Sequence, residues 1–393
     1  MKILIIHEID WMKKVVFEPH HLSELFSIAG HDVFVIDVPD PGVMSINKTI
    51  FGERKNIHRT YEKANVTLIH TPIIPIKGIS RVSAFMTSHN FIKKIINKKK
   101  IDVVFMYSIA TNAQAVIKVC KELEIPIIHR TFDIIHELVR EEYLREKILK
   151  IEREVYPLFD RVIANTPHMK KWSEEMGSKN TIVIPQGVDS NLMKPLLPEQ
   201  DLLTQLKISS NDKVVMYLGS IESFSGLDIL LEQIPQIMEK IPEFKLLIVG
   251  GGSHLESIKN KTKQMSLENT IIFTGYVPYL DVPKYASLAK LCINTFVVNS
   301  MTDKLSPVKI FDLLSCGKTI IATPLSGLLF DFPQKESVLM YSELNDFGEN
   351  IISALNNPEI EDIGKRGREF IKEKFAWSQI SKNMLKELSE IVK

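Results

Sequence analysis

The chain has 393 residues, of which 45% are hydrophobic and 25% charged, and its formal net charge is +1. This composition excludes a disordered chain, and the length favours two domains of ordinary size. A balanced charge without a recognisable binding module argues against nucleic acid as a partner. Three isolated cysteines indicate buried thiols in a reducing compartment. The first apolar run, 2–7, is too short for a signal peptide or a membrane span, so we expect a cytoplasmic protein.

Short apolar runs in the first half of the chain are separated by amphipathic stretches. The runs are rich in Val and Ile and do not alternate with polar residues, which is typical of strands covered on both faces of a parallel sheet. The stretches between them, such as 112–125, have helical periodicity, so strand and helix follow one another repeatedly. The expected strands are 2–7, 32–38, 66–70, 102–107, 125–129, 161–165 and 181–185.

The polar, aperiodic stretch 186–200 interrupts this order and is interpreted as a linker. The same alternation then resumes, so we expect an α/β protein of two Rossmann-like domains facing across a cleft, with a ligand bound where they face. The expected boundaries are 1–190 and 200–370, followed by a C-terminal helix at 371–393 that packs back on the first domain. The strands expected in the second half are 214–219, 245–252, 270–276, 291–296, 319–324 and 337–342.

The stretch SPVKIFDLLSCGKTIIAT at 306–323 is the most informative part of the sequence. Pro307 and the apolar period after it predict a helix over 308–315. Lys309 and Asp312 are three residues apart and therefore share one face of this helix. A lysine near free helix N–H groups suits a phosphate, and a carboxylate accepts hydrogen bonds from ribose hydroxyls. A surface ion pair between the two residues is the alternative interpretation.

This stretch resembles the donor-site motif of retaining glycosyltransferases of the two-Rossmann (GT-B) fold, of the group 1 or family 4 type. The shared pattern is Ser-Pro-x-Lys, a carboxylate three residues on, then Gly-Lys and an apolar strand. Other resemblances follow in the order of that family. They are VIPQGVD (183–189), YLGSIESFSGLDILLEQIPQI (217–237), LLIVGGGSHLESIK (246–259), IIFTGYVPYLDVPKYASLAKL (271–291) and FAWSQIS (375–381). The second half resembles the family in its motifs, and the first half resembles it in architecture.

The resemblance implies a metal-independent, retaining transfer of a sugar from a nucleotide-diphosphate donor to a glycan or a polyprenyl- or other lipid-linked acceptor. The donor sugar is a substrate, and no cofactor is implied. The first domain would bind the acceptor and the second the nucleotide sugar. Lys309 would contact and stabilise the leaving diphosphate, and Asp312 would bind the ribose. The remaining donor-binding residues implied are Gly219, Ser220, Tyr276, Val277, Ser306, Gly327 and Leu328.

Several positions depart from the family pattern. Asp312 stands where the family usually has Glu, and Lys304 stands where many relatives have a second Glu. Ser220 and Ser225 occupy positions where many relatives have Arg and Lys. Diphosphate binding would therefore depend more heavily on Lys309. These departures also motivate an alternative, a non-catalytic nucleotide-sugar-binding or partner subunit with a degenerate GT-B fold.

Two rival ligand motifs fail on inspection. Gly317-Lys318-Thr319 mimics the end of a P-loop, but the loop glycine position holds Asp312 and a strand follows in place of a helix. Gly250-x-Gly252 suggests a dinucleotide fingerprint, but the third glycine position holds Leu255. No Asp-x-Asp follows a strand to hold a divalent ion, which favours stabilisation of the leaving group by lysine and helix N-termini.

Polar side chains crowd the end of the expected strand 125–129 in the acceptor half. Relatives show a similar Arg-x-x-Asp, so Arg130 and Asp133 are the catalytic candidates, with Asp133 positioning or deprotonating the acceptor hydroxyl. The alternative is a loop whose polar groups cap the next helix. His7 and Glu8, at the end of the first strand, are further candidates.

Residues 80–100 combine an apolar helical face with basic neighbours. A basic amphipathic helix can lie on an anionic membrane surface, which would place the protein peripherally on the inner face of the membrane. The alternative is a helix that packs on its own sheet and ends in a solvated lysine turn. The expected apolar face comprises Val82, Phe85, Met86, Ile92 and Ile96.

Overall fold

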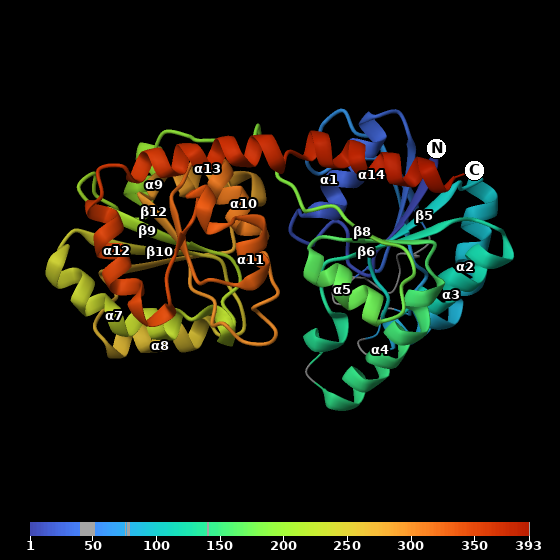
Figure 1. Ribbon diagram of the computed structural model, residues 1–393, viewed down its shortest axis with the longest axis horizontal. Helices are drawn as coiled ribbons and strands as arrows, with labels where there is room; N and C mark the ends of the chain where they lie inside the picture. The colour runs from blue at the N-terminus through green and yellow to red at the C-terminus, as the bar shows by residue number, and fades with distance from the viewer. Residues whose placement is uncertain (40–51, 75, 77–78, 140, 393) are drawn as a thin grey trace. The chain divides into compact units, whose positions relative to one another are not determined.

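The computed structural model describes residues 1–39, 52–74, 76, 79–139 and 141–392. The chain forms two compact units (Figure 1). Unit 1 comprises Met1–Gln186 together with Trp377–Lys393, and unit 2 comprises Gly187–Ala376. Each unit contains one sheet of mainly parallel strands between helices. The expected α/β class with two Rossmann-like domains is confirmed.

The sheet of unit 1 has the strand order β3-β4-β2-β1-β5-β6-β7-β8. All neighbours are parallel except β3, which pairs antiparallel with β4. We did not predict β3, because its residues are polar and exposed and it is held at the sheet edge by its backbone. The strands are β1 (Lys2–Ile6), β2 (Asp32–Asp37), β3 (Glu53–Ile57), β4 (Val66–His70), β5 (Val103–Met106), β6 (Ile127–Thr131), β7 (Arg161–Ala164) and β8 (Thr181–Val183).

Helices cover both faces of this sheet, and alternate strand residues point into two separate cores. Ile3 and Ile5 of β1 pack with α1 (Glu18–Ile28) and α14 (Trp377–Ile391), which lie side by side (Figure 1). Leu4 and Ile6 pack on the other face. The helices of that other core are α2 (Ser80–Lys99), α3 (Ala113–Glu122), α4 (Glu142–Val155) and α5 (Pro167–Glu175). Burial on both faces explains the continuous apolar runs in the sequence.

The sheet of unit 2 is parallel throughout, in the order β11-β10-β9-β12-β13-β14. Its strands are β9 (Lys213–Leu218), β10 (Phe244–Val249), β11 (Ile271–Gly275), β12 (Leu291–Asn294), β13 (Ile320–Ala322) and β14 (Met340–Tyr341). The helices α7 and α8 lie on one side of the sheet, and α10 and α13 lie on the other (Figure 1). The helices are α6 (Gln200–Gln205), α7 (Leu227–Lys240), α8 (Leu255–Gln264), α9 (Val282–Leu288), α10 (Val308–Ser315), α11 (Ser326–Asp331), α12 (Phe347–Asn356) and α13 (Ile360–Lys374).

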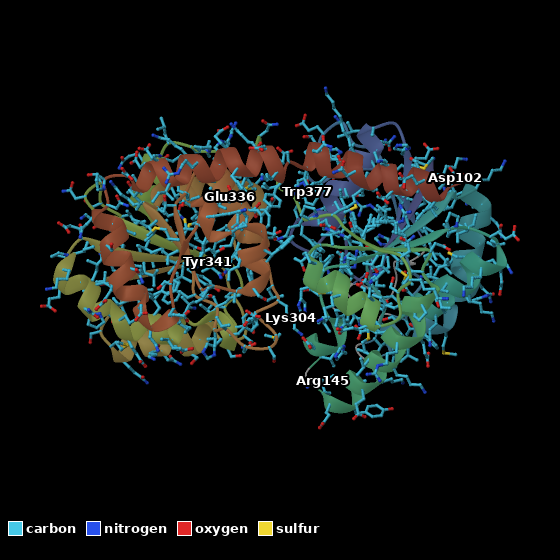
Figure 2. All side chains as sticks on the ribbon, in the orientation of Figure 1. Asp102, Arg145, Lys304, Glu336, Tyr341 and Trp377 are labelled. Carbon is cyan, nitrogen blue, oxygen red and sulfur yellow. The ribbon has the colours of Figure 1, made fainter. Side chains whose placement is uncertain are left out.

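The C-terminal tail contains two helices where we expected one. Helix α13 ends at Lys374 in unit 2, and α14 begins at Trp377 in unit 1 (Figure 2). The break follows from what the two flanking aromatic residues pack against. Phe375 packs edge-on against Phe311 in the core of unit 2, with ring centroids 5.0 Å apart. Trp377 stacks on His21 of α1, at 5.6 Å.

No helix within the described ranges combines the length and the apolar character needed to cross a membrane.

Candidate functional site

Helix α10 spans Val308–Ser315, as the sequence predicts, and it carries Lys309. The ammonium of Lys309 lies 4.2 Å from the ring centroid of Tyr217 and 4.3 Å from that of Phe296. Its Nζ is buried and has no hydrogen-bond partner among the described residues. Burial lowers the pKa of Lys309 to about 7. A desolvated amine without a partner is suited to receive an anion.

Asp312 lies one turn further along α10, and its side chain is only 5% exposed. The hydroxyl of Tyr279 donates a hydrogen bond of 3.0 Å to its Oδ1. Burial raises the pKa of Asp312 to about 7, although the Tyr279 hydrogen bond opposes this shift. Because the Lys309 amine is not hydrogen-bonded to this carboxyl group, the two residues do not form the alternative surface ion pair.

The residues that the resemblance assigned to the donor follow the carboxyl ends of the strands. Gly219 and Ser220 follow β9, with a φ of +124° at Gly219. A Cβ at Gly219 would lie 3.1 Å from Cδ of Lys309, so the absence of a side chain there lets the lysine lie against the backbone. Tyr276 and Val277 follow β11, and the Tyr276 hydroxyl donates to the carbonyl of Gly251 at 2.7 Å. This edge is where open α/β sheets bind ligands.

The loop before α10 and the start of α11 are tied to each other. The amides of Ser326 and Gly327 donate to Asp303 at 2.9 and 3.0 Å. The hydroxyl of Ser306 donates to the buried Asp331 at 2.5 Å. The amide of Gly327, one of the implied donor-binding residues, is therefore engaged within unit 2. Leu328 is buried, and Lys304 lies in the loop before α10 (Figure 2).

Ser220 and Ser225, which stand where many relatives carry cations, differ in their exposure to solvent. Ser220 is exposed, whereas Ser225 is fully buried and its Oγ has no partner among the described residues. Glu222, between them, accepts hydrogen bonds from the amide and the hydroxyl of Ser253. This loop therefore supplies no positive charge of its own beside Lys309.

The acceptor candidates lie at the carboxyl edge of the unit 1 sheet. Asp133 follows β6 and is half-buried. Burial raises its pKa to about 6, and the charge of Lys14 acts in the opposite direction. Glu8 has a structural role, because its Oε1 accepts the amides of Thr111 and Asn112 at 2.8 and 3.2 Å at the start of α3.

Arg130 is fully buried in the core of unit 1. Its guanidinium makes two hydrogen bonds to the carboxylate of Glu18, at 2.6 and 2.8 Å, and a third to the carbonyl of Ile184, at 2.7 Å. These contacts join α1, β6 and the end of β8. The structure therefore shows Arg130 in a structural role, and its direct contact with an acceptor stays a prediction.

Two family models match the chain. Glycosyltransferase Family 4 matches residues 20–192, and Glycosyl transferases group 1 matches residues 212–357. The first range takes in most of unit 1, and the second lies within unit 2. The chain is a glycosyltransferase of the GT-B type. This family assignment agrees with the two parallel-sheet units and with the place of Lys309 and Asp312 in the second.

Solved structures with the fold of this glycosyltransferase cover nearly the whole chain. Sucrose-phosphate synthase from Thermosynechococcus elongatus is 20% identical, with a TM-score of 0.77 over 99% of this chain and 98% of that chain. HepE from Anabaena in complex with UDP-glucose is 15% identical, with a TM-score of 0.73 over 99% of this chain and 100% of that chain.

A curated relative also extends over both units of this glycosyltransferase. Alpha-monoglucosyldiacylglycerol synthase from Streptococcus pneumoniae is 20% identical over an alignment of 385 positions that covers 91% of this chain and 82% of the relative. For two further curated glycosyltransferase relatives, each 24% identical, the match spans only 53% of their length.

We did not predict the roles of three aromatic residues of this glycosyltransferase. Tyr217 and Phe296 flank the Lys309 amine, and Tyr279 binds Asp312. In the sequence each belongs to an ordinary apolar strand or loop, so no local signal separates them from core residues.

Within the described ranges, no group of three or more His, Cys, Asp or Glu side chains is arranged to hold a metal ion.

Proposed function

We propose that this glycosyltransferase moves a sugar, with retention and without a metal ion, from a nucleotide-diphosphate donor to a glycan or lipid-linked acceptor. The observation that carries the proposal is the Lys309 amine, buried without a hydrogen-bond partner among the described residues at the carboxyl edge of the unit 2 sheet. An unpaired buried amine costs stability, and an anionic group placed beside it removes that cost. A diphosphate is such a group. The buried Lys309 amine therefore favours a donor substrate that carries a diphosphate.

The donor would be held by the two polar residues of α10 together. Lys309 in its protonated form contacts the diphosphate and stabilises the charge that grows as the bond to the anomeric carbon breaks. Asp312 in its ionised form accepts a hydrogen bond from a ribose hydroxyl, and Tyr279 holds it in place. The UDP-glucose complex of the structurally similar HepE supports a nucleotide sugar as the donor class.

The acceptor would bind at the carboxyl edge of the unit 1 sheet, beside Asp133. A half-buried carboxyl group with a pKa of about 6 is mostly ionised at neutral pH and can accept a proton from an attacking hydroxyl. In a retaining transfer the acceptor oxygen attacks the anomeric carbon from the face that the diphosphate leaves. The name of one relative, alpha-monoglucosyldiacylglycerol synthase, supports a lipid among the acceptors.

The protein would be cytoplasmic and touch the inner face of the membrane through residues 80–100. Helix α2 supports this in part: Val82, Phe85 and Met86 are 56%, 52% and 78% exposed. Ile92 and Ile96 are instead buried in the core of unit 1, so the apolar face that we expected is divided between core and surface. The exposed half can be tested with vesicles containing anionic lipid. Replacing Val82, Phe85 and Met86 by Ser should abolish co-sedimentation, and unchanged co-sedimentation would contradict the membrane contact.

Nucleotide binding followed by transfer tests the central proposal. Thermal unfolding with UDP, GDP, ADP and dTDP should reveal one base that raises the Tm, because a ligand of the native state stabilises it. The matching nucleotide sugar should then be hydrolysed slowly or transferred. Lys309→Ala should remove both the Tm shift and the turnover. A Tm shift with neither hydrolysis nor transfer would instead support a non-catalytic nucleotide-sugar-binding subunit, and no shift with any nucleotide would contradict both functions.

A further inference from the structure

Unit 2 has a pocket at the amino edge of its sheet, opposite the edge where Lys309 lies. The loops that enter β9, β12 and β13 line this amino-edge pocket, together with α6 and the first half of α13. Its volume is about 660 Å³, within the range of roughly 300–1,000 Å³ that small-molecule sites occupy. Because β9 has six residues, the pocket lies about 20 Å from the donor residues at the carboxyl edge.

Many of the side chains that line the amino-edge pocket are apolar. Leu203 of α6 is half-buried and Pro198 is exposed, so the wall still has apolar surface in contact with water. A ligand that covers this surface with apolar atoms gains free energy from its burial. The apolar lining includes Pro195, Pro198, Leu203, Ile208, Leu288 and Ile360.

The pocket also has cations without a carboxylate partner. The Lys318 ammonium donates to a backbone carbonyl at 2.8 Å, and the Arg368 guanidinium donates to three backbone carbonyls. The Lys290 side chain is exposed. Among the described residues, none of these three cations forms an ion pair with a carboxylate, whereas Lys365 pairs with Asp362 at 2.8 Å. The uncompensated positive charge favours an anion.

The carboxylates that line the pocket have other partners or remain in water. Glu369 forms an ion pair with Lys372, at 2.8 Å, and Lys372 does not line the pocket. Asp212 accepts the amide of Ser209 at 2.7 Å. Glu361 is exposed. These carboxylates therefore leave the lysine charges at the pocket wall largely uncompensated.

Lys290 and Lys318 are close enough for their charges to interact. Burial lowers the pKa of Lys318, and the charge of Lys290 acts in the same direction, whereas Glu361 and two buried thiols oppose the shift. An ammonium group has three N–H donors, and the carbonyl of Ala289 accepts one from Lys318. An anionic head group can accept a remaining donor and relieve the repulsion between the two lysines.

We propose that the amino-edge pocket binds a small amphiphilic anion, whose head group pairs with Lys290 and Lys318 and whose apolar part covers Leu203. A free phosphate would leave the apolar wall in water, and a neutral apolar molecule would leave the ammonium groups unpaired. A carboxylate and a phosphate head group share the chemistry that the lysines require. The site is separate from the donor site, so the inference does not depend on the transfer reaction.

Titration calorimetry with eight-carbon probes tests the ligand class. Octyl phosphate and octanoate should bind below their critical micelle concentrations, and the tighter of the two identifies the head group. Inorganic phosphate and octyl glucoside each lack one half of the ligand and should bind at least about tenfold more weakly. Octyl glucoside that binds as tightly as the better anion would overturn the role of the cations. Phosphate that binds as tightly would overturn the role of the apolar wall.

Substitutions in unit 2 test the location. Lys318→Met keeps an apolar stem and removes the charge, so the Kd for the better anion should rise about tenfold. Lys290→Met, at an exposed position, should act in the same direction and stay folded. The Kd for octyl glucoside should not change in either variant. An anion affinity that neither substitution changes would overturn the site.

Two further lysines serve as controls. Lys245→Met is the matched control, because the Lys245 ammonium also donates to a backbone carbonyl, at 2.6 Å, but does not line the pocket. Lys309→Ala removes the amine at the opposite edge of the sheet. Both variants should bind the anionic probe as the wild-type chain does. Loss of probe binding in Lys309→Ala would place the anion in the donor site and overturn the inference.

Discussion

The hydroxyl of Tyr279 and the carboxyl group of Asp312 form a 3.0 Å hydrogen bond across 33 residues of sequence. The bond brings the loop after β11 onto α10, and it holds an aspartate where the family usually has the longer glutamate. It also favours the ionised form of Asp312, against the effect of burial. Tyr279 is therefore a positioning residue for the carboxylate that we assign to the ribose.

Tyr279→Phe tests this position. Without the hydroxyl, the pKa of Asp312 should rise further, so less of the carboxylate is present at neutral pH. Nucleotide affinity at pH 7 should fall roughly three- to tenfold, and the pH at which binding is half-maximal should move upward. Titration calorimetry across a pH series measures both effects. Tyr285→Phe in α9 removes a hydroxyl from the same unit and should leave the midpoint in place.

Nucleotide affinity should depend on pH in both directions around neutrality. Burial lowers the pKa of Lys309 to about 7, so the amine loses its proton as the pH rises above 7 and the attraction for diphosphate is lost, by up to tenfold per pH unit. Burial raises the pKa of Asp312 to about 7, so the carboxylate is lost as the pH falls below 7. Binding should peak near pH 7.

The alkaline side of this profile has its own control. Lys309→Arg keeps a cation that does not lose its proton, so affinity should stay level as the pH rises. Calorimetry in buffers of different ionisation enthalpy should also show proton uptake on nucleotide binding above pH 7 in the wild-type chain and none in Lys309→Arg. A pH-independent affinity in the wild-type chain would contradict the assignment of Lys309.

Arg130 should matter for stability more than for chemistry. Arg130→Met leaves the buried Glu18 carboxylate without its partner, which should cost about 3–5 kcal/mol of unfolding free energy. The paired change Arg130→Met with Glu18→Leu should recover much of this loss. All three tryptophans, Trp11, Trp172 and Trp377, belong to unit 1, so their fluorescence during urea unfolding reports this unit. A stable Arg130→Met variant that has lost only transfer would instead support a catalytic role.

Asp133→Asn separates acceptor chemistry from donor binding. If the carboxylate accepts the proton of the acceptor hydroxyl, kcat for transfer should fall roughly 10²- to 10⁴-fold. In the wild-type chain, kcat should rise with pH through about 6, where Asp133 ionises, and this rise should disappear in the variant. The nucleotide-induced Tm shift should be the same in both proteins, and unchanged transfer would exclude Asp133 as the base.

The sequence by itself predicted the elements that local patterns specify. Every strand expected from an apolar run is present, and α10 begins and ends where its period and Pro307 indicate. These predictions succeed because burial on both sheet faces requires continuous apolar residues, and a helix with one buried face repeats its apolar residues about every 3.6 positions. The placement of Lys309 and Asp312 on one helix follows from spacing alone. The exposed strand β3 was missed because nothing apolar marks it.

Tertiary structure decided what each polar group meets. Residues far apart in sequence determine that the Lys309 amine lies between Tyr217 and Phe296, that Tyr279 binds Asp312, and that Glu18 pairs with Arg130. The division of α2 into an exposed apolar half and a buried half likewise depends on where the helix meets the sheet. Helical or strand character follows from neighbours in the chain. The charge state and partners of a side chain depend instead on burial and on long-range contacts, which only the folded chain creates.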